Sequence, residues 1–221
     1  MKREFLTLLT IGSFAFFASC GNQGTEKKTE EKDQKVEEAA KKEECTYAFD
    51  LENTSVKWTA YKTTEKIGVS GTFDSLIVSN TQKASSIASV FENATFEIPV
   101  ATVNSNAPDR DKKILAHFFG VMDETTSIKG KVLGVDEAIG IISMDITMNN
   151  ISKAFDFSYE IKDNTLSVSA EGMKLSHWKA QPAVDSLNTV CYDLHKGSDG
   201  VSKLWPEVKI EIASKVQKDC K

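Results

Sequence analysis

Residues 139–172 read IGIISMDITMNNISKAFDFSYEIKDNTLSVSAEG and carry the clearest structural pattern in the chain. Apolar residues occupy every second position over residues 142–148, 155–161 and 166–170. This period of two puts successive side chains on opposite faces of a strand, whereas helical side chains repeat every 3.6 residues. Asp163-Asn164, between the last two segments, suits a hairpin turn. The pattern predicts long antiparallel strands that each have one apolar face.

A single sheet with so much apolar area on one face must pack against a second layer or close on itself. Further strands are expected over residues 47–50, 55–61, 67–73, 75–79, 94–98, 128–133 and 208–212. Helices are expected over residues 108–119 and 182–195, with a short one over 84–91. Many consecutive strands with few helices predict an all-β fold, an antiparallel barrel or sandwich. A barrel of about eight strands is either filled by side chains or holds one small ligand.

The first 20 residues form a separate targeting segment. Lys2 and Arg3 precede an apolar run over residues 5–17 that is too short to span a bilayer comfortably. The sequence FASC at residues 17–20 resembles the lipobox of bacterial lipoproteins, although Phe17 replaces the usual leucine. In that class the signal is cleaved before the cysteine, which then carries lipid. We therefore expect a lipoprotein signal peptide that ends at Cys20; an ordinary signal peptide or an uncleaved anchor is the alternative.

Residues 21–44 are more than half charged and contain no aromatic residue, so this segment cannot bury enough surface to fold alone. We expect a flexible linker here, followed by one domain over residues 45–221. The net charge of the chain is −5 at pH 7. An acidic balance argues against nucleic acid as a partner and against broad adhesion to anionic lipid.

Three cysteines remain if Cys20 carries lipid, which is an odd number for an exported protein. Cys45 opens the domain and Cys220 nearly closes it. The first and last strands of a closed sheet can be neighbours, so a disulfide between Cys45 and Cys220 is favoured over the rival pair Cys191 and Cys220. No Cys-x-x-Cys occurs, and the cysteine spacings fit no zinc motif.

Several motifs resemble the YceI-like, polyisoprenoid-binding family in their order and spacing. They are YAFDL at residues 47–51, SVKW at 55–58, VSGTF at 69–73, Arg110-Asp111 followed by Leu115 and Phe118-Phe119, and DITMNNISK at 145–153. Two segments depart from the family pattern, residues 102–108 and the longer segment 174–199. The resemblance implies an extended, lipocalin-like antiparallel β-barrel whose interior holds a long isoprenoid or a similar amphiphile.

Alternating and helix-borne apolar residues supply the candidate lining of such a pocket. These candidates are Trp58, Phe73, Leu115, Phe118, Phe119, Met144, Ile146, Met148, Phe155, Phe157 and Tyr159. Methionine adapts its shape to irregular apolar ligands. A barrel filled by these same side chains, acting as an envelope or stress-related interaction module, is the alternative hypothesis.

Catalytic chemistry has little support in the sequence. There is no nucleophile elbow, P-loop, dinucleotide fingerprint or His-Glu-x-x-His motif. His117, His177 and His195 lack the spacing of metal ligands. We expect no enzymatic activity, no cofactor and no metal.

The targeting segment and the resemblance together predict the location. We expect a membrane-anchored lipoprotein in the cell envelope of a Gram-negative bacterium, on the periplasmic side of the outer membrane. The expected partners are an isoprenoid or other amphiphilic lipid and the membrane itself. The sequence leaves the oligomeric state open, with a homodimer among the alternatives.

Overall fold

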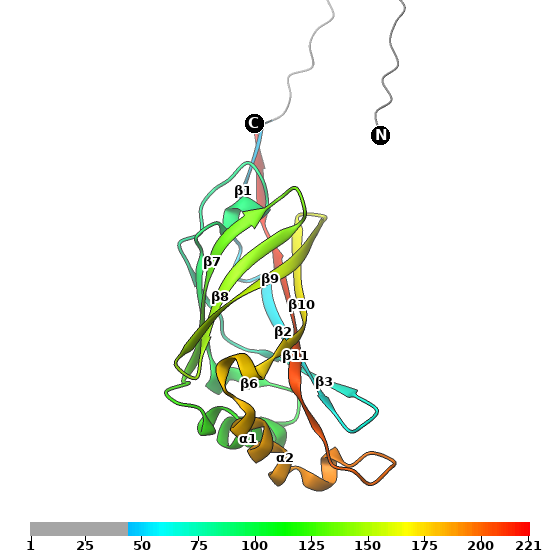
Figure 1. Ribbon diagram of the computed structural model, residues 1–221. Coiled ribbons are helices and arrows are strands. Elements are labelled where there is room, and N and C mark those ends of the chain that lie inside the picture. The colour runs from blue at the N-terminus through cyan, green and yellow to red at the C-terminus, as the bar shows by residue number, and fades with distance from the viewer. Residues whose placement is uncertain (1–43) are drawn as a thin grey trace, which may run out of the picture. The chain divides into compact units, whose positions relative to one another are not determined.

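Ten strands form one antiparallel sheet that curls into a half-barrel (Figure 1). The computed structural model describes residues 44–221, so the expected signal peptide, Cys20 and most of the expected linker lie outside the described residues. The strand order in the sheet is β4-β5-β7-β8-β9-β10-β11-β2-β3-β6. The strands are β2 (Thr54–Lys62), β3 (Ile67–Phe73), β4 (Ile77–Ser79), β5 (Thr95–Pro99), β6 (Val103–Asn104), β7 (Ser127–Asp136), β8 (Ile141–Met148), β9 (Ile151–Lys162), β10 (Thr165–Lys174) and β11 (Leu204–Lys215).

Two tight hairpins build the middle of the sheet. Asn149-Asn150 joins β8 to β9 and Asp163-Asn164 joins β9 to β10, and all four residues have a positive φ between 50° and 60°. A two-residue turn with positive φ at both positions matches the twist of the flanking strands, and Asn and Asp tolerate this conformation. The register pairs Ile142 with Phe157, so the apolar faces of β8 and β9 coincide. The antiparallel strands and the turn at Asp163-Asn164 are as predicted.

The predicted lipocalin-like antiparallel barrel is confirmed, with one difference in how it closes. The edge strand β4 pairs only with β5, and the opposite edge strand β6 pairs only with β3. β4 follows β3 after residues 74–76, and β6 follows β5 after the 3-10 turn Val100–Thr102, so the two short ladders are parts of one interrupted seam between the two ends of the sheet. A backbone hydrogen bond from Asp74 N to Thr102 O, at 2.8 Å, links the β3–β4 connection to the β5–β6 connection.

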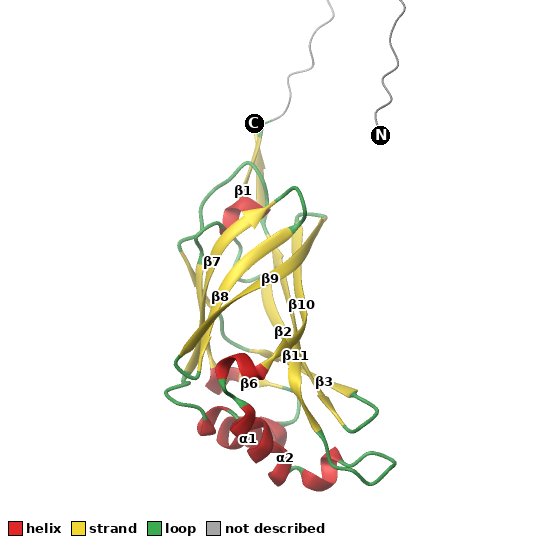
Figure 2. Ribbon diagram, viewed as in Figure 1, coloured by secondary structure: helices red, strands yellow, loops and turns green. Residues whose placement is uncertain are grey.

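Two helices cover one end of the half-barrel, α1 (Pro108–His117) and α2 (Gln181–Val190) (Figure 2). Both begin with proline in the first turn, where its missing N–H costs nothing. Both are shorter than expected because a 3-10 turn continues the chain after each, at Phe119–Val121 and Tyr192–His195. The helix expected over residues 84–91 is wrong, since only the 3-10 turn Ala88–Phe91 forms there.

A separate two-stranded ribbon stands at the end of the half-barrel opposite the helices (Figure 1). β1 (Cys45–Ala48) pairs with β12 (Gln217–Cys220), and Cys45 lies opposite Cys220 in the register. A disulfide joins these two cysteines. Cys191, the member of the rival pair, is buried with a free thiol. The ends of the domain are therefore fastened to each other.

Candidate functional site

A cavity of about 230 Å³ runs through the half-barrel. This is more than ten times the roughly 10–15 Å³ that one water molecule requires. Its walls come from the inner faces of most strands and from both helices. The principal lining residues are Val56, Trp58, Ala60, Phe73, Leu76, Val78, Phe96, Ile98, Ile114, Phe118, Phe119, Met144, Ile146, Met148, Phe157, Met173, Trp178, Leu187, Leu204, Trp205, Val208, Ile210 and Ile212.

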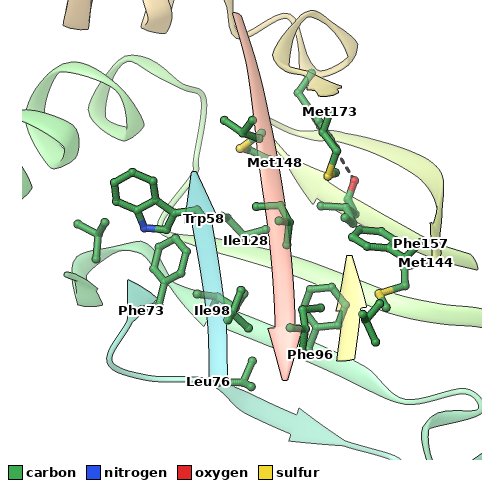
Figure 3. A pocket seen from close by; sticks show the side chains of 18 of the residues that line it. Trp58, Phe73, Leu76, Phe96, Ile98, Ile128, Met144, Met148, Phe157 and Met173 are labelled. Carbon is green, nitrogen blue, oxygen red and sulfur yellow. Dashed lines mark hydrogen bonds between the residues drawn. The ribbon is translucent and has the colours of Figure 1, made fainter. Parts of the chain in front are cut away.

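The lining of the cavity is almost entirely apolar. Among residues 44–221 that form its walls, none is charged, and the hydroxyl groups belong to Thr54, Thr95 and Ser214. Thr54 and Ser214 bond each other at 2.7 Å between their oxygens, which satisfies both groups. Figure 3 shows Trp58 and Phe73 on one side of the cavity, with Met144 and Phe157 on the other. Such walls suit a hydrocarbon and offer an ion nothing.

The hollow part of the half-barrel follows β2 and β11. The inner residues of β8, from Ile142 to Met148, are only 1–8 % exposed because neighbouring side chains pack over them. On β11, in contrast, Val208, Ile210 and Ile212 are only partly buried although they line the interior of a sheet. Their free surface faces the cavity. The β8 side of the cavity is therefore more tightly packed than the β11 side.

The cavity extends along most of the half-barrel. Leu204 and Ser214, at the two ends of β11, both line it. Ten residue steps of extended strand span about 30 Å at roughly 3.3 Å per residue. Pro206 lies in a bulge of this strand, where its missing N–H leaves no gap in the ladder. The shape suits a long, thin molecule better than a compact one.

Eight of the eleven candidate residues line the cavity. These eight are Trp58, Phe73, Phe118, Phe119, Met144, Ile146, Met148 and Phe157. Leu115 does not line the cavity. Ile114 and Phe118 face it, and each further residue along a helix is rotated by about 100°, so Leu115 points away from the cavity. Tyr159 packs against the core near the β7–β8 turn. Burial raises the pKa of its hydroxyl, and the negative charges of Glu137 and Asp136 raise this pKa further.

Phe155, the third candidate outside the cavity, lies where the barrel wall is split. The β9–β10 ladder ends at Ser158 and Ser169, and a bulge follows on β10 before Met173. The 3-10 turn Leu175–Trp178 fills the gap: Trp178 stacks on Phe155 at 5.0 Å between ring centroids. Trp178 Nε1 also donates to Ile146 O at 3.0 Å. The ring of Phe155 therefore closes this part of the barrel wall. It lines a groove on the outside of the barrel, beside Met173.

Apart from Trp58, the sequence-based candidates did not include the wall formed by β2 and β11. Ala60, Val208, Ile210 and Ile212 belong to it. The alternation over residues 208–212 shows which way these side chains point, and could have nominated them. Alternation does not show whether another side chain fills the space in front of them.

Two glycines make room for aromatic rings of the wall. A Cβ at Gly71 would lie 2.4 Å from the Trp58 ring, and one at Gly130 would lie 2.0 Å from the Phe96 ring. Contacts this short are excluded, so each ring can rest against the strand only because the glycine has no side chain. Gly71 and Gly130 thus determine how two rings of the cavity wall are placed, although neither glycine lines the cavity itself.

Metal or membrane-spanning features were not found in the part of the chain that the structure describes. Residues 44–221 contain no group of three His, Cys, Asp or Glu side chains able to hold a metal ion. No helix in that range is long and apolar enough to cross a bilayer.

Asp111, from the Arg110-Asp111 motif, accepts hydrogen bonds from the Ser105 backbone N–H and hydroxyl and so fixes the start of α1.

Two solved structures share this architecture at low sequence identity. A polyisoprenoid binding domain from Saccharophagus degradans, implicated in plant cell wall breakdown, matches with a TM-score of 0.54 and 12% identity over 80% of this chain and 100% of that chain. BcnA from Burkholderia cenocepacia matches with a TM-score of 0.51 and 12% identity over 76% of this chain and 99% of that chain. Similarity at this level of identity establishes the fold.

A comparison with curated proteins gives no match to this sequence. The family model of the YceI-like domain, however, matches residues 47–216. The matched range begins in β1 and ends just before β12, and so includes the whole half-barrel and its cavity. The chain therefore belongs to the YceI-like domain family.

Proposed function

We propose that this domain binds a long-chain isoprenoid or a similar amphiphilic lipid inside the half-barrel, and carries or stores it in the bacterial cell envelope. The observation that supports this most directly is the elongated, uncharged cavity along β2 and β11. Each buried methylene contributes about 0.8 kcal/mol, so a chain of about 20 carbons gains on the order of 10 kcal/mol after ordering costs. Binding of this kind requires no catalytic group.

The relative from Saccharophagus degradans supports the same ligand class, because it is described as a polyisoprenoid binding domain. In this chain the adaptable thioethers of Met144, Met148 and Met173 line the cavity together with aromatic rings. A branched, unsaturated tail of irregular outline matches walls of this composition.

The first test is ligand retention by the full chain. Purified from membranes in mild detergent and examined by native mass spectrometry, the protein should carry about one lipid per chain. The Ala60→Trp variant should lose most of this lipid, because an indole at Ala60 occupies the cavity between β2 and β11. Ser55→Trp is the matched control, since Ser55 lies on the outer face of the same strand and is exposed.

Equal lipid content in all three proteins would place the lipid outside the cavity. Protein that is always empty, and that takes up no prenyl chain offered in detergent, would favour an interaction module without a lipid ligand.

Membrane attachment through Cys20 is part of the proposal and rests on the sequence FASC at residues 17–20. A Cys20→Ser variant should move from the membrane fraction to the soluble fraction of an osmotic-shock extract, because the acylated residue is absent. Immunoblotting of both fractions measures the change. A variant that stays with the membrane to the same extent as the unmodified protein contradicts the lipid anchor.

A further inference from the structure

The inner face of β2 changes character at one end of the cavity. Val56, Trp58 and Ala60 line the cavity, and Lys62 is the next residue on the same face. The register pairs Lys62 with Leu204, which also lines the cavity. The ammonium group of Lys62 therefore lies just beyond the apolar wall of the cavity, at the end that α1 and α2 cover.

Contacts to a neighbouring 3-10 turn hold the Lys62 side chain at this end. Its Nζ donates a hydrogen bond to Leu194 O, in Tyr192–His195, at 2.9 Å. An ammonium has three N–H donors, so two remain for another partner. Among residues 44–221, Lys62 forms no ion pair with a carboxylate.

A second cation lies in the same region. Lys113 is half-buried on α1, directly before the lining residue Ile114, and it too has no carboxylate partner within the described range. Burial lowers the pKa of His195, and the positive charges of Lys62 and Lys113 lower it further. Since α1 packs against α2, and the 3-10 turn with Leu194 and His195 follows α2, both lysines lie at this end of the half-barrel.

His195 itself is buried and faces Asn188, with 2.8 Å between His195 Nδ1 and Asn188 Oδ1. Its lowered pKa keeps the ring uncharged at neutral pH, so the positive charge at this end belongs to the lysines. His195 therefore adds no positive charge beside the lysines.

The acidic residues of the surrounding elements are engaged elsewhere. Asp109 pairs with Lys112, and Asp193 pairs with Lys196. Asp185 accepts a hydrogen bond from the Gln181 amide, and Asp111 is bound by Ser105. Among residues 44–221, none of these carboxylates forms an ion pair with Lys62 or Lys113.

We propose that this end of the cavity binds the anionic head group of the lipid, a phosphate or a carboxylate, through Lys62 with Lys113 beside it. This inference rests on the proposed lipid binding and adds the charge of the ligand. The long tail lies along β2 and β11, and the head group accepts hydrogen bonds from the free N–H donors of Lys62. Charge-assisted hydrogen bonds of this type are the strong ones in proteins.

The test compares three ligands that share one tail: geranylgeranyl phosphate, geranylgeranoic acid and the neutral alcohol geranylgeraniol. Binding to the delipidated full chain is followed through tryptophan fluorescence, since Trp58 and Trp205 line the cavity. We expect at least one anion to bind about tenfold more tightly than the alcohol. The anion that binds more tightly identifies the head group as phosphate or carboxylate.

The variant Lys62→Met keeps most of the length of the side chain and removes its charge. It should abolish the preference for the anion, because the affinity for the anion should fall much more than the affinity for geranylgeraniol. Lys113→Met should reduce the preference in part. The control is Lys57→Met on the outer face of β2, where Lys57 pairs with Glu211 at 3.2 Å; this variant should retain the full preference.

Equal affinity of the unmodified protein for all three ligands would overturn the head-group assignment while leaving lipid binding intact. The same would follow if Lys57→Met and Lys62→Met had equal effects. Failure of every ligand to bind would instead count against the proposed function itself. Circular dichroism of each variant confirms that it is folded.

Discussion

Replacing Cys45 and Cys220 together by serine should lower the free energy of unfolding by about 2–5 kcal/mol, the usual cost of losing a native disulfide. The bond joins residues 175 apart in the sequence, so its removal frees almost the entire domain in the unfolded state. It also releases the ribbon of β1 and β12, whose four residue pairs stand apart from the main sheet. Urea denaturation followed by circular dichroism measures the loss.

Reduction provides the control for this experiment. Dithiothreitol should destabilise the unmodified protein to the level of the double variant and should leave the double variant unchanged. Cys191 is buried and unbridged, so it contributes nothing to the response. A double variant as stable as the unmodified protein in the absence of reductant would show that the ends of the domain are held by other contacts.

Trp178→Ala should lower the free energy of unfolding by about 3–5 kcal/mol, as for other large aromatic residues removed from a core. Trp178 is 1% exposed and fills the split between β9 and β10. Its loss removes the stacking on Phe155 and leaves Ile146 O without the indole donor. The opened split also joins the cavity to the outer groove beside Met173, so the rate of lipid release should rise.

Two variants separate the contributions of Trp178. Trp178→Phe keeps an aromatic ring and loses the hydrogen bond, so it should cost less than the alanine variant. His177→Ala removes the exposed neighbour in the same turn and should change stability by less than about 1 kcal/mol, as at most surface positions. Similar stability for Trp178→Ala and His177→Ala would contradict the role assigned to the indole.

Period-two alternation and turn chemistry made much of the sheet predictable. The strands of residues 139–172 and the turn at Asp163-Asn164 follow from local rules, because a positive φ at both turn positions favours these residue types. Pro108 likewise marks the start of α1. Each of these features depends on interactions close in the sequence.

The location of the cavity depends on contacts distant in the sequence, and for this reason it could not be read from the pattern. Met144 and Ile210 occupy equivalent alternating positions and both line the cavity, yet Met144 is only 5% exposed and Ile210 is only partly buried. The difference arises from the neighbours that each meets across the half-barrel. The turn that carries Trp178 has no periodicity, so its place in the wall depended on the bulge of β10.

The interrupted seam of the sheet has a consequence for the width of the cavity. In a fully closed barrel the number and stagger of the strands fix the diameter. Here the seam between the two ends of the sheet holds only the short ladders β3–β6 and β4–β5, with residues 74–76 and 100–102 between them, so few backbone hydrogen bonds fix the width at this side. The cavity can therefore adjust its width most easily at this seam, where the fewest backbone pairs would change.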